Sequence, residues 1–215
     1  LAGLLLPMYA RLYAQKESLL PLLHFSVQLL LAGSLCAAIP LVVYSQEVVD
    51  LLYDFADQRT GAILFFLALT FIAQCLNYAY GALLSGTGFI GRMNKIYALG
   101  IILNFGGNLL VLPRYGATGA AAITLLTQAF IAVTQAILAH RWLALPAGGI
   151  AWFRILLLFT LLASCGLALQ HFNPLPNLSW IIQAVLLGSI GLGAALMLRL
   201  IALDKLFELA KPAEA

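Results

Sequence analysis

The chain has 215 residues, of which 63% are hydrophobic and 9% are charged, and its mean hydropathy is +1.02. Soluble domains contain about 25% charged residues, and a domain of this length must keep much of its surface in water. The composition therefore excludes a soluble domain, a disordered chain, a secreted disulfide framework and a nucleic-acid-binding domain. It predicts a protein whose solvent is the lipid bilayer.

Six apolar runs are long enough to cross a bilayer as helices, which takes about 20 residues. They cover residues 22–44, 61–84, 96–113, 116–139, 152–171 and 179–198. Residues 1–9 have the composition of the end of another span, so we expect the chain to be a piece of a longer one. Because runs of this length do not fit the alternating strands of a barrel, the expected fold is an all-α polytopic membrane bundle with six complete transmembrane helices and the end of a seventh.

Lys and Arg are unevenly divided between the two sides that these spans define. One side has nine basic residues: Arg11, Lys16, Arg92, Lys95, Arg141, Arg154, Arg199, Lys205 and Lys211. The other side has two, Arg59 and Arg114. Because basic residues favour cytoplasmic loops, the sequence predicts that the first side and the C-terminus are cytoplasmic.

The segment 45–58 on the opposite side is acidic and amphipathic. Glu47, Asp50, Asp54 and Asp57 recur at helical spacing with apolar residues between them. This pattern predicts a short helix lying in the membrane interface. Two interpretations stay open, a solvated cap on the preceding span and a gate for cargo.

Neutral polar residues form stripes inside the spans. The six runs contain no Asp, Glu or Lys, and their one Arg, Arg154, lies near a span end. In the first four runs, amide, hydroxyl and small side chains recur at steps of three and four, which places them on one helix face. Each stripe alone is explained by helix packing in lipid, whereas four adjacent stripes predict a shared water-filled cavity.

The cavity interpretation gives a candidate substrate pathway. Its expected residues are Gln28, Gln74, Asn77, Tyr78, Asn104, Asn108, Thr124 and Gln128. It divides the chain into core helices at 1–144 and, at 145–215, two peripheral helices with a short cytoplasmic tail. His24 is a weaker candidate because it lies near the end of its span.

Enzyme and cofactor motifs are absent or out of context in the sequence. Residues 86–91 match GxGxxG by letter, but a membrane run precedes them where the dinucleotide fingerprint needs a strand. Arg92 and Lys95 follow this turn and are candidates for binding lipid phosphates. The sequence has no metal-spaced His/Cys cluster or hydrolase motif, and Cys36, Cys75 and Cys165 lie singly in apolar runs. We therefore expect no cofactor, no metal and no enzymatic activity.

The segment between the third and fourth runs predicts a helical hairpin. Pro113 is expected to end one helix, Gly116 to permit a tight turn, and Gly119 to let the returning helix pack closely. The full pattern is Leu103-Asn104, then Asn108, then Leu112-Pro113-Arg114-Tyr115-Gly116-Ala117, then Gly119-Ala120-Ala121 and Thr124.

This pattern resembles the second-lobe signature of the polysaccharide (O-antigen type) flippases of the MOP exporter superfamily. Segments 6–13, 48–53 and 83–95 are similar to further segments of that family. The resemblance covers nearly the whole chain, as helices eight to fourteen of a fourteen-helix, two-lobe, MATE-like transporter. One departure is Asp54, where the family usually has Gly.

The resemblance implies a function. A flippase of this kind moves a polyprenyl-pyrophosphate-linked oligosaccharide from the inner to the outer leaflet of the bacterial inner membrane by alternating access. Its partners are the lipid bilayer and an N-terminal lobe of the same chain, which would have to supply the cationic residues for the pyrophosphate. Three alternatives stay open: a MATE-like drug/cation antiporter, a membrane glycosyltransferase or ligase, and a non-transporting scaffold.

Overall fold

The computed structural model describes residues 2–53, 57–146, 148–172 and 179–201, which contain seven α-helices and no strand. The helices are α1 (Ala2–Ala14), α2 (Leu20–Val43), α3 (Ser45–Leu52), α4 (Gln58–Gly86), α5 (Ile90–Trp142), α6 (Trp152–Phe172) and α7 (Trp180–Met197). Asp54 and the predicted tail lie outside the described residues. Five helices, α2, α4, α5, α6 and α7, are long and apolar enough to cross a membrane. The prediction of an all-helical membrane bundle is thereby confirmed.

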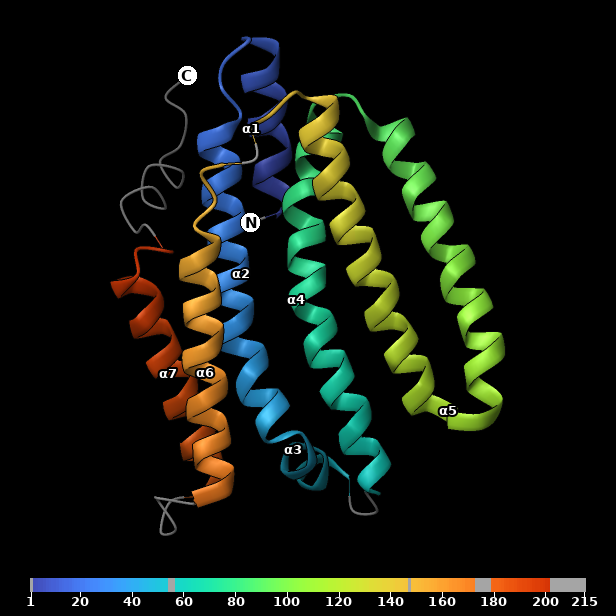
Figure 1. The fold of residues 1–215 in the computed structure, drawn as a ribbon, viewed down its shortest axis with the longest axis vertical. Helices are drawn as coiled ribbons and strands as arrows, with labels where there is room; N and C mark the ends of the chain where they lie inside the picture. The colour runs from blue at the N-terminus through green and yellow to red at the C-terminus, as the bar shows by residue number, and fades with distance from the viewer. Residues whose placement is uncertain (1, 54–56, 147, 173–178, 202–215) are drawn as a thin grey trace.

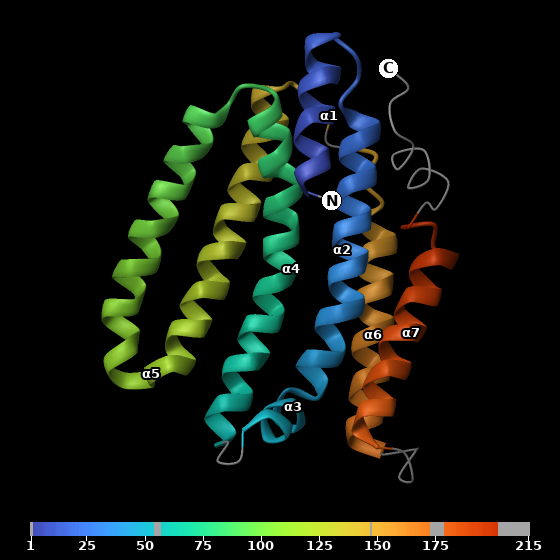
Figure 2. The same ribbon diagram turned by 180° about the vertical axis from the view of Figure 1, so that it is seen from behind.

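The longest helix, α5, is a hairpin. A straight helix of its 53 residues would measure about 80 Å, whereas the hydrocarbon core is about 30 Å thick. At Gly116 the backbone leaves the helical region, with φ 57° and ψ −144°, and the chain turns back. The two arms, residues 90–115 and 117–142, run antiparallel and side by side (Figures 1 and 2). They correspond to the third and fourth predicted runs.

The hairpin turn falls at Gly116 and not at Pro113. The sequence predicts that Pro113 ends the first arm, but the helix continues through it. A proline so close to a helix end removes one backbone hydrogen bond, while the positive φ of the turn is a conformation that glycine adopts far more easily than other residues. The turn is therefore placed by the glycine.

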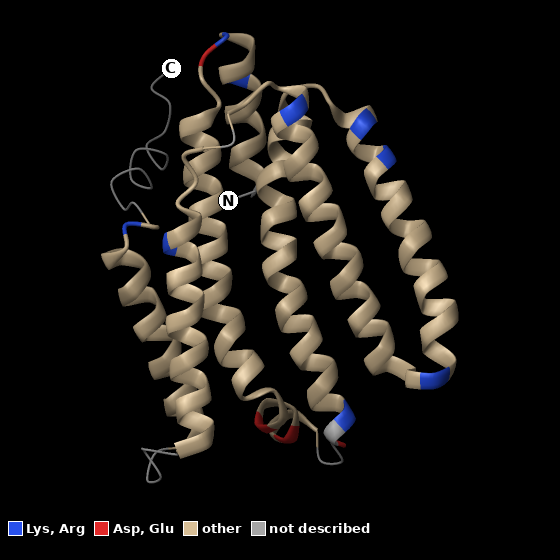
Figure 3. Cartoon of the chain, in the orientation of Figure 1, with Lys and Arg blue, Asp and Glu red and all other residues tan. Residues whose placement is uncertain are grey.

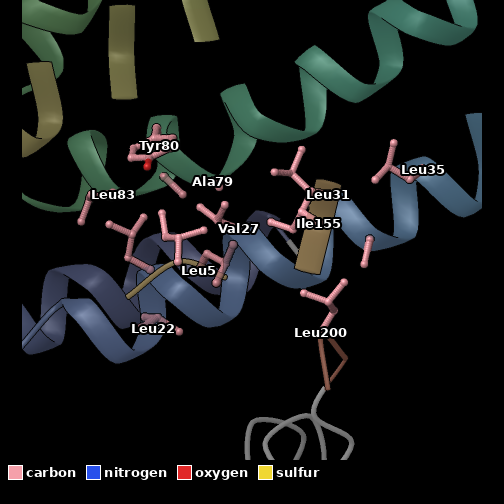
Figure 4. Packing of buried hydrophobic residues seen from close by; sticks show 14 of the residues in the cluster. Leu5, Leu22, Val27, Leu31, Leu35, Ala79, Tyr80, Leu83, Ile155 and Leu200 are labelled. Carbon is pink, nitrogen blue, oxygen red and sulfur yellow. The ribbon is translucent and has the colours of Figure 1, made fainter. Parts of the chain in front are cut away.

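The core of the bundle lies around α2. Half of its most apolar 18-residue stretch is buried, against 28% for the corresponding stretch of α4. Figure 4 shows side chains of α1, α2 and α4, among them Leu5, Val27 and Leu83, meeting in this core. Among the fully buried members of the described core, α5 contributes Ala139. Lipid is itself apolar, so van der Waals contact and hydrogen bonds between helices hold such a core together.

Helices α6 and α7 pack on α2 and on each other, and both ends of this contact carry polar bonds. The Tyr44 hydroxyl, directly after α2, donates to Oε1 of Gln183 in α7 at 2.8 Å. At the opposite end, Nη1 of Arg154 in α6 donates to the carbonyl oxygen of Leu198, the residue after α7, at 3.3 Å. Arg154 is exposed, which agrees with its expected place at a span end.

The two short helices lie at opposite ends of the bundle (Figure 1). In α1, which extends to Ala14 and not only to Tyr9, the Tyr9 hydroxyl lies 2.9 Å from Oγ of Ser26 in α2. The predicted interfacial helix at 45–58 is present as α3 but ends at Leu52, and Tyr53 is extended. Leu51 and Leu52 are exposed on α3, as expected of a helix at a membrane surface.

Most charged residues lie toward the two ends of the bundle, and Arg154 and Arg199 lie where α6 begins and α7 has ended (Figure 3). We call the end with the C-terminus of α1 and both termini of α5 the basic end; it carries Arg11, Lys16, Arg92, Lys95 and Arg141. We call the other end, which carries α3 and the turn of α5, the acidic end. The division agrees with the two sides expected from the sequence.

Candidate functional site

A pocket of ≈ 670 Å³ lies along the α5 hairpin. It is lined by Tyr97, Gly100, Ile101, Asn104, Phe105, Asn108, Thr124, Thr127, Gln128 and Ile131. The first six residues belong to the first arm and the other four to the second, and all lie near the middle of the arms. Four of the eight expected pathway residues therefore line one pocket at mid-depth.

Small side chains bring the two arms together around this pocket. A Cβ atom at Gly100 would lie 2.5 Å from Cδ1 of Ile131, and one at Gly107 would lie 2.9 Å from Cγ2 of Ile123. Real Cβ atoms do not approach other heavy atoms so closely, so alanine at either glycine would require the isoleucine side chain opposite it to shift. The glycines thus set the spacing at which polar side chains of both arms can meet.

The polar side chains of the pocket form a directional network. Asn108 Nδ2 donates to Oδ1 of Asn104 at 3.0 Å, one helical turn away, and Asn104 Nδ2 lies 3.4 Å from Oγ1 of Thr127 on the other arm. Thr124 turns its hydroxyl back onto the carbonyl oxygen of Ala120 at 2.9 Å. The network therefore joins the arms through neutral groups that both donate and accept hydrogen bonds.

Asn77 of α4 is hydrogen-bonded to Gln128, a residue of the second arm that lines the pocket. Its Nδ2 donates to Oε1 of Gln128 at 2.7 Å and lies 3.4 Å from the backbone oxygen of the same residue. Asn77 is buried, so this amide pair lies inside the contact between α4 and the second arm. The pair belongs to a packing contact and at the same time positions a residue that lines the pocket.

Some acceptors of this network have no partner in the described part of the protein. They are Oδ1 of Asn77 and Oδ1 of Asn108, both buried. Buried amide oxygens are almost always hydrogen-bonded. One of these acceptors belongs to Asn108, which lines the pocket, and the other to Asn77, which bonds the pocket residue Gln128, so each needs an O–H or N–H donor from outside the described residues.

The other expected pathway residues lie elsewhere. On α4, Gln74 is half-buried and Tyr78 is 47% exposed, and neither lines the pocket. Gln28 is half-buried on α2, which lies on the far side of α4 from α5 (Figures 1 and 2). The structure does not bring these three residues to the α5 pocket.

The polar stripe of α2 faces away from α5. A Cβ atom at Gly149, before α6, would lie 2.1 Å from the His24 ring, and one at Gly191 in α7 would lie 3.1 Å from Sγ of Cys36. Gln28 is one turn from His24 and two turns from Cys36, on the same helix face. The expected four-helix interior is thus not the arrangement around this pocket, which α5 alone lines, because helical spacing shows which residues share a face but not which helix that face meets.

The lining contains no charged side chain, and the basic residues expected to bind lipid phosphates lie at the basic end. The Arg92 guanidinium lies 5.3 Å from the ring centroids of both Phe89 and Trp142, and these rings stack at 5.7 Å. Arg92 and Lys95 are exposed. Cation–π contacts with these two rings therefore hold the exposed Arg92 side chain at the start of α5.

Three polar residues at or beside the pocket are missing from the expected pathway set: Tyr97, Thr127 and Gln135. Tyr97 and Thr127 line the pocket, and Gln135 is fully buried two turns beyond Gln128. Tyr97 lies three residues before Gly100, on the same helix face as Asn104 and Asn108. Its spacing could therefore have predicted that it lines the pocket.

Metal ligation has no candidate in the described residues, where no group of three or more His, Cys, Asp or Glu lies together. The chain matches no protein-family model, no curated protein and no solved structure.

Proposed function

We propose that this chain is the second lobe of a transporter that moves a lipid-linked oligosaccharide from the inner to the outer leaflet of a bacterial inner membrane. Transport proceeds by alternating access between two lobes, with the basic end and the C-terminus in the cytoplasm. The resemblance of residues 103–124 to the polysaccharide flippases supports this proposal. The distribution of basic residues supports the orientation.

The observation that carries the proposal is the uncharged polar pocket in the middle of α5. Its lining combines amides and hydroxyls with apolar side chains and contains no charge. Sugar hydroxyls donate and accept hydrogen bonds, as amides do, and apolar side chains suit the C–H faces of sugar rings. A volume of ≈ 670 Å³ lies within the range of about 300–1,000 Å³ that is typical of ligand pockets.

The position of the basic residues fits a head group with two parts. Asn104 follows Lys95 by nine positions along the first arm, which corresponds to about 14 Å. A pyrophosphate at the membrane surface can contact Arg92 and Lys95 while the attached sugar reaches the amides deeper in the bundle. The charged phosphates then stay at the membrane surface, where the free-energy penalty for a charge is much smaller than in the bilayer centre.

The proposal is tested by replacing pocket amides in the full-length protein. We expect Asn104→Leu and Asn108→Leu to lower surface glycan by about tenfold or more at unchanged protein level, because leucine keeps the size but loses the hydrogen bonds. Leu110→Ala is the matched control, since Leu110 lies in the same arm and is 78% exposed. Wild-type glycan in both amide variants, or glycan that falls only in step with protein level, would show that these amides serve packing alone.

The phosphate contact is tested separately at the surface. Arg92→Gln together with Lys95→Gln should lower glycan export, whereas Arg114→Gln, at the turn on the opposite end, should not. An equal loss of glycan export in the Arg92/Lys95 double variant and in the Arg114→Gln variant would contradict a phosphate site at the basic end.

A further inference from the structure

The buried amide of Gln135 marks a polar site between α4 and α5. Gln135 is 0% exposed, and neither Nε2 nor Oε1 has a hydrogen-bond partner in the described part of the protein. An unpaired buried amide is destabilising, and such groups in native proteins are commonly satisfied by ordered water.

Gly81 of α4 leaves space next to this amide. A Cβ atom at Gly81 would lie 3.5 Å from the Tyr97 hydroxyl oxygen and 3.8 Å from Oε1 of Gln135, and apart from the neighbouring residues and backbone of α4 it would meet no other atom within 4 Å. At Gly100 and Gly119, by contrast, a Cβ atom would lie only 2.5 and 2.4 Å from a neighbouring side chain. Close helix approach explains those two glycines but not Gly81, which borders a space large enough for a methyl group.

Tyr97 connects this space to the pocket. The residue lines the pocket, and its hydroxyl borders the space beside Gly81. Two further buried acceptors lie nearby along the pocket: Oδ1 of Asn77, whose Nδ2 bonds Gln128 across the α4–α5 contact, and Oδ1 of Asn108, which lines the pocket. The polar lining of the pocket thus continues inward to Gln135.

We propose that Gly81, Tyr97 and Gln135 form a binding site for an ordered water molecule at the inner end of the α5 pocket. The water accepts from the Tyr97 hydroxyl or the Gln135 amide nitrogen and donates to Oε1 of Gln135. A molecule that both donates and accepts can bond whichever amide atom of Gln135, oxygen or nitrogen, faces the space. The site makes this part of the α4–α5 contact hydrated, and it does not depend on the nature of the cargo.

The test is the effect of Gly81→Ala on the Tm of the purified full-length protein in detergent micelles. A methyl group fits the space, and alanine is the better helix former, so a dry space predicts a higher Tm. A water site predicts the reverse, because the methyl group displaces the water and leaves Gln135 unpaired. We expect the Tm to fall by about 2–4 °C or more.

The same substitution in Gln135→Leu protein identifies the cause of the lower Tm. In Gln135→Leu protein, where no amide needs the water, Gly81→Ala should no longer lower the Tm. Gly106→Ala, where a Cβ atom meets nothing within 4 Å, is the matched control and should raise it. An unchanged or higher Tm for Gly81→Ala would overturn the proposal, as would an equal fall in both backgrounds, which would indicate a steric clash.

Discussion

Asn77 of α4 donates a 2.7 Å hydrogen bond to Oε1 of Gln128 in the second arm of α5. The same Nδ2 lies 3.4 Å from the backbone oxygen of Gln128, so one side chain holds both the backbone and the side chain of a pocket residue. This contact fixes α4 against the hairpin at the depth of the pocket. The same amide pair therefore contributes to the packing of α4 on α5 and to the position of a pocket residue.

A double-mutant cycle measures this contact. Asn77→Leu and Gln128→Leu should each lower the free energy of unfolding. The coupling between them should be about 0.6 kcal/mol, the average for hydrogen bonds between membrane helices, and no more than about 1.7 kcal/mol. The measurement is reversible unfolding in mixed micelles. Strict additivity of the two substitutions would contradict the hydrogen bond.

The turn of the hairpin predicts a strong effect at Gly116. Its φ of 57° and ψ of −144° place it near a region that is essentially restricted to glycine. Gly116→Ala should therefore lower the free energy of unfolding by about 1–3 kcal/mol. Gly106→Ala, in the helical first arm, should raise it by about 0.5–1 kcal/mol. Equal effects of the two substitutions would argue against the turn at Gly116.

Contact between α1 and α4 predicts an effect at Gly86. A Cβ atom there would lie 2.8 Å from the carbonyl oxygen of Leu6 and 3.0 Å from the backbone nitrogen of Ala10, and backbone atoms cannot move aside as a side-chain end can. Gly86→Ala should lower the Tm by separating the helices. Gly33→Ala, at an open position of α2, should raise it, and a higher Tm in both variants would contradict the close contact.

The Tyr44–Gln183 bond predicts a pH dependence at the acidic end. Burial raises the pKa of Tyr44 above its ordinary value of 10.0, and the Glu47 carboxylate adds to the rise. The unfolded chain therefore loses this proton first, so the stability that the bond contributes is present below pH 10 and is lost as the pH rises above it. In thermal unfolding, Tyr44→Phe should have a lower Tm than wild type near neutral pH, and the difference should shrink above about pH 10. A constant difference would contradict the assignment.

Much of the fold could be predicted from the sequence, because spans in lipid are set by length and hydropathy. The apolar runs predicted the membrane-spanning helices, and the proline and glycines at residues 113–119 predicted the hairpin. The sequence did not predict that the first arm continues through Pro113, because proline and glycine both interrupt helices. Which of the two residues ends the helix depends on the backbone angles that the turn adopts.

The site could be predicted only in part. Asn104, Asn108, Thr124 and Gln128 line one pocket, and their helical spacing indicated a shared face. The position of Gln28 required knowing that its side of α2 meets α6 and α7, which is a property of tertiary packing and not of spacing. The role of Gln135 likewise depends on the space beside Gly81, which periodicity does not describe.

The most direct test of the account is the reactivity of a thiol in the pocket with and without cargo. In full-length protein with Cys36, Cys75 and Cys165 replaced by serine, Thr124→Cys places a thiol in the pocket. Val133→Cys places one at a position of the same arm that is 54% exposed and outside the pocket. A water-soluble methanethiosulfonate reagent needs the thiolate, which forms in water and not in lipid.

We predict that position 124 reacts readily in membrane vesicles and that the lipid-linked oligosaccharide slows its reaction by about tenfold or more. Position 133 should react slowly and at the same rate with and without the oligosaccharide. An unreactive thiol at position 124, or a rate there that the oligosaccharide leaves unchanged, would contradict a hydrated cargo path along α5.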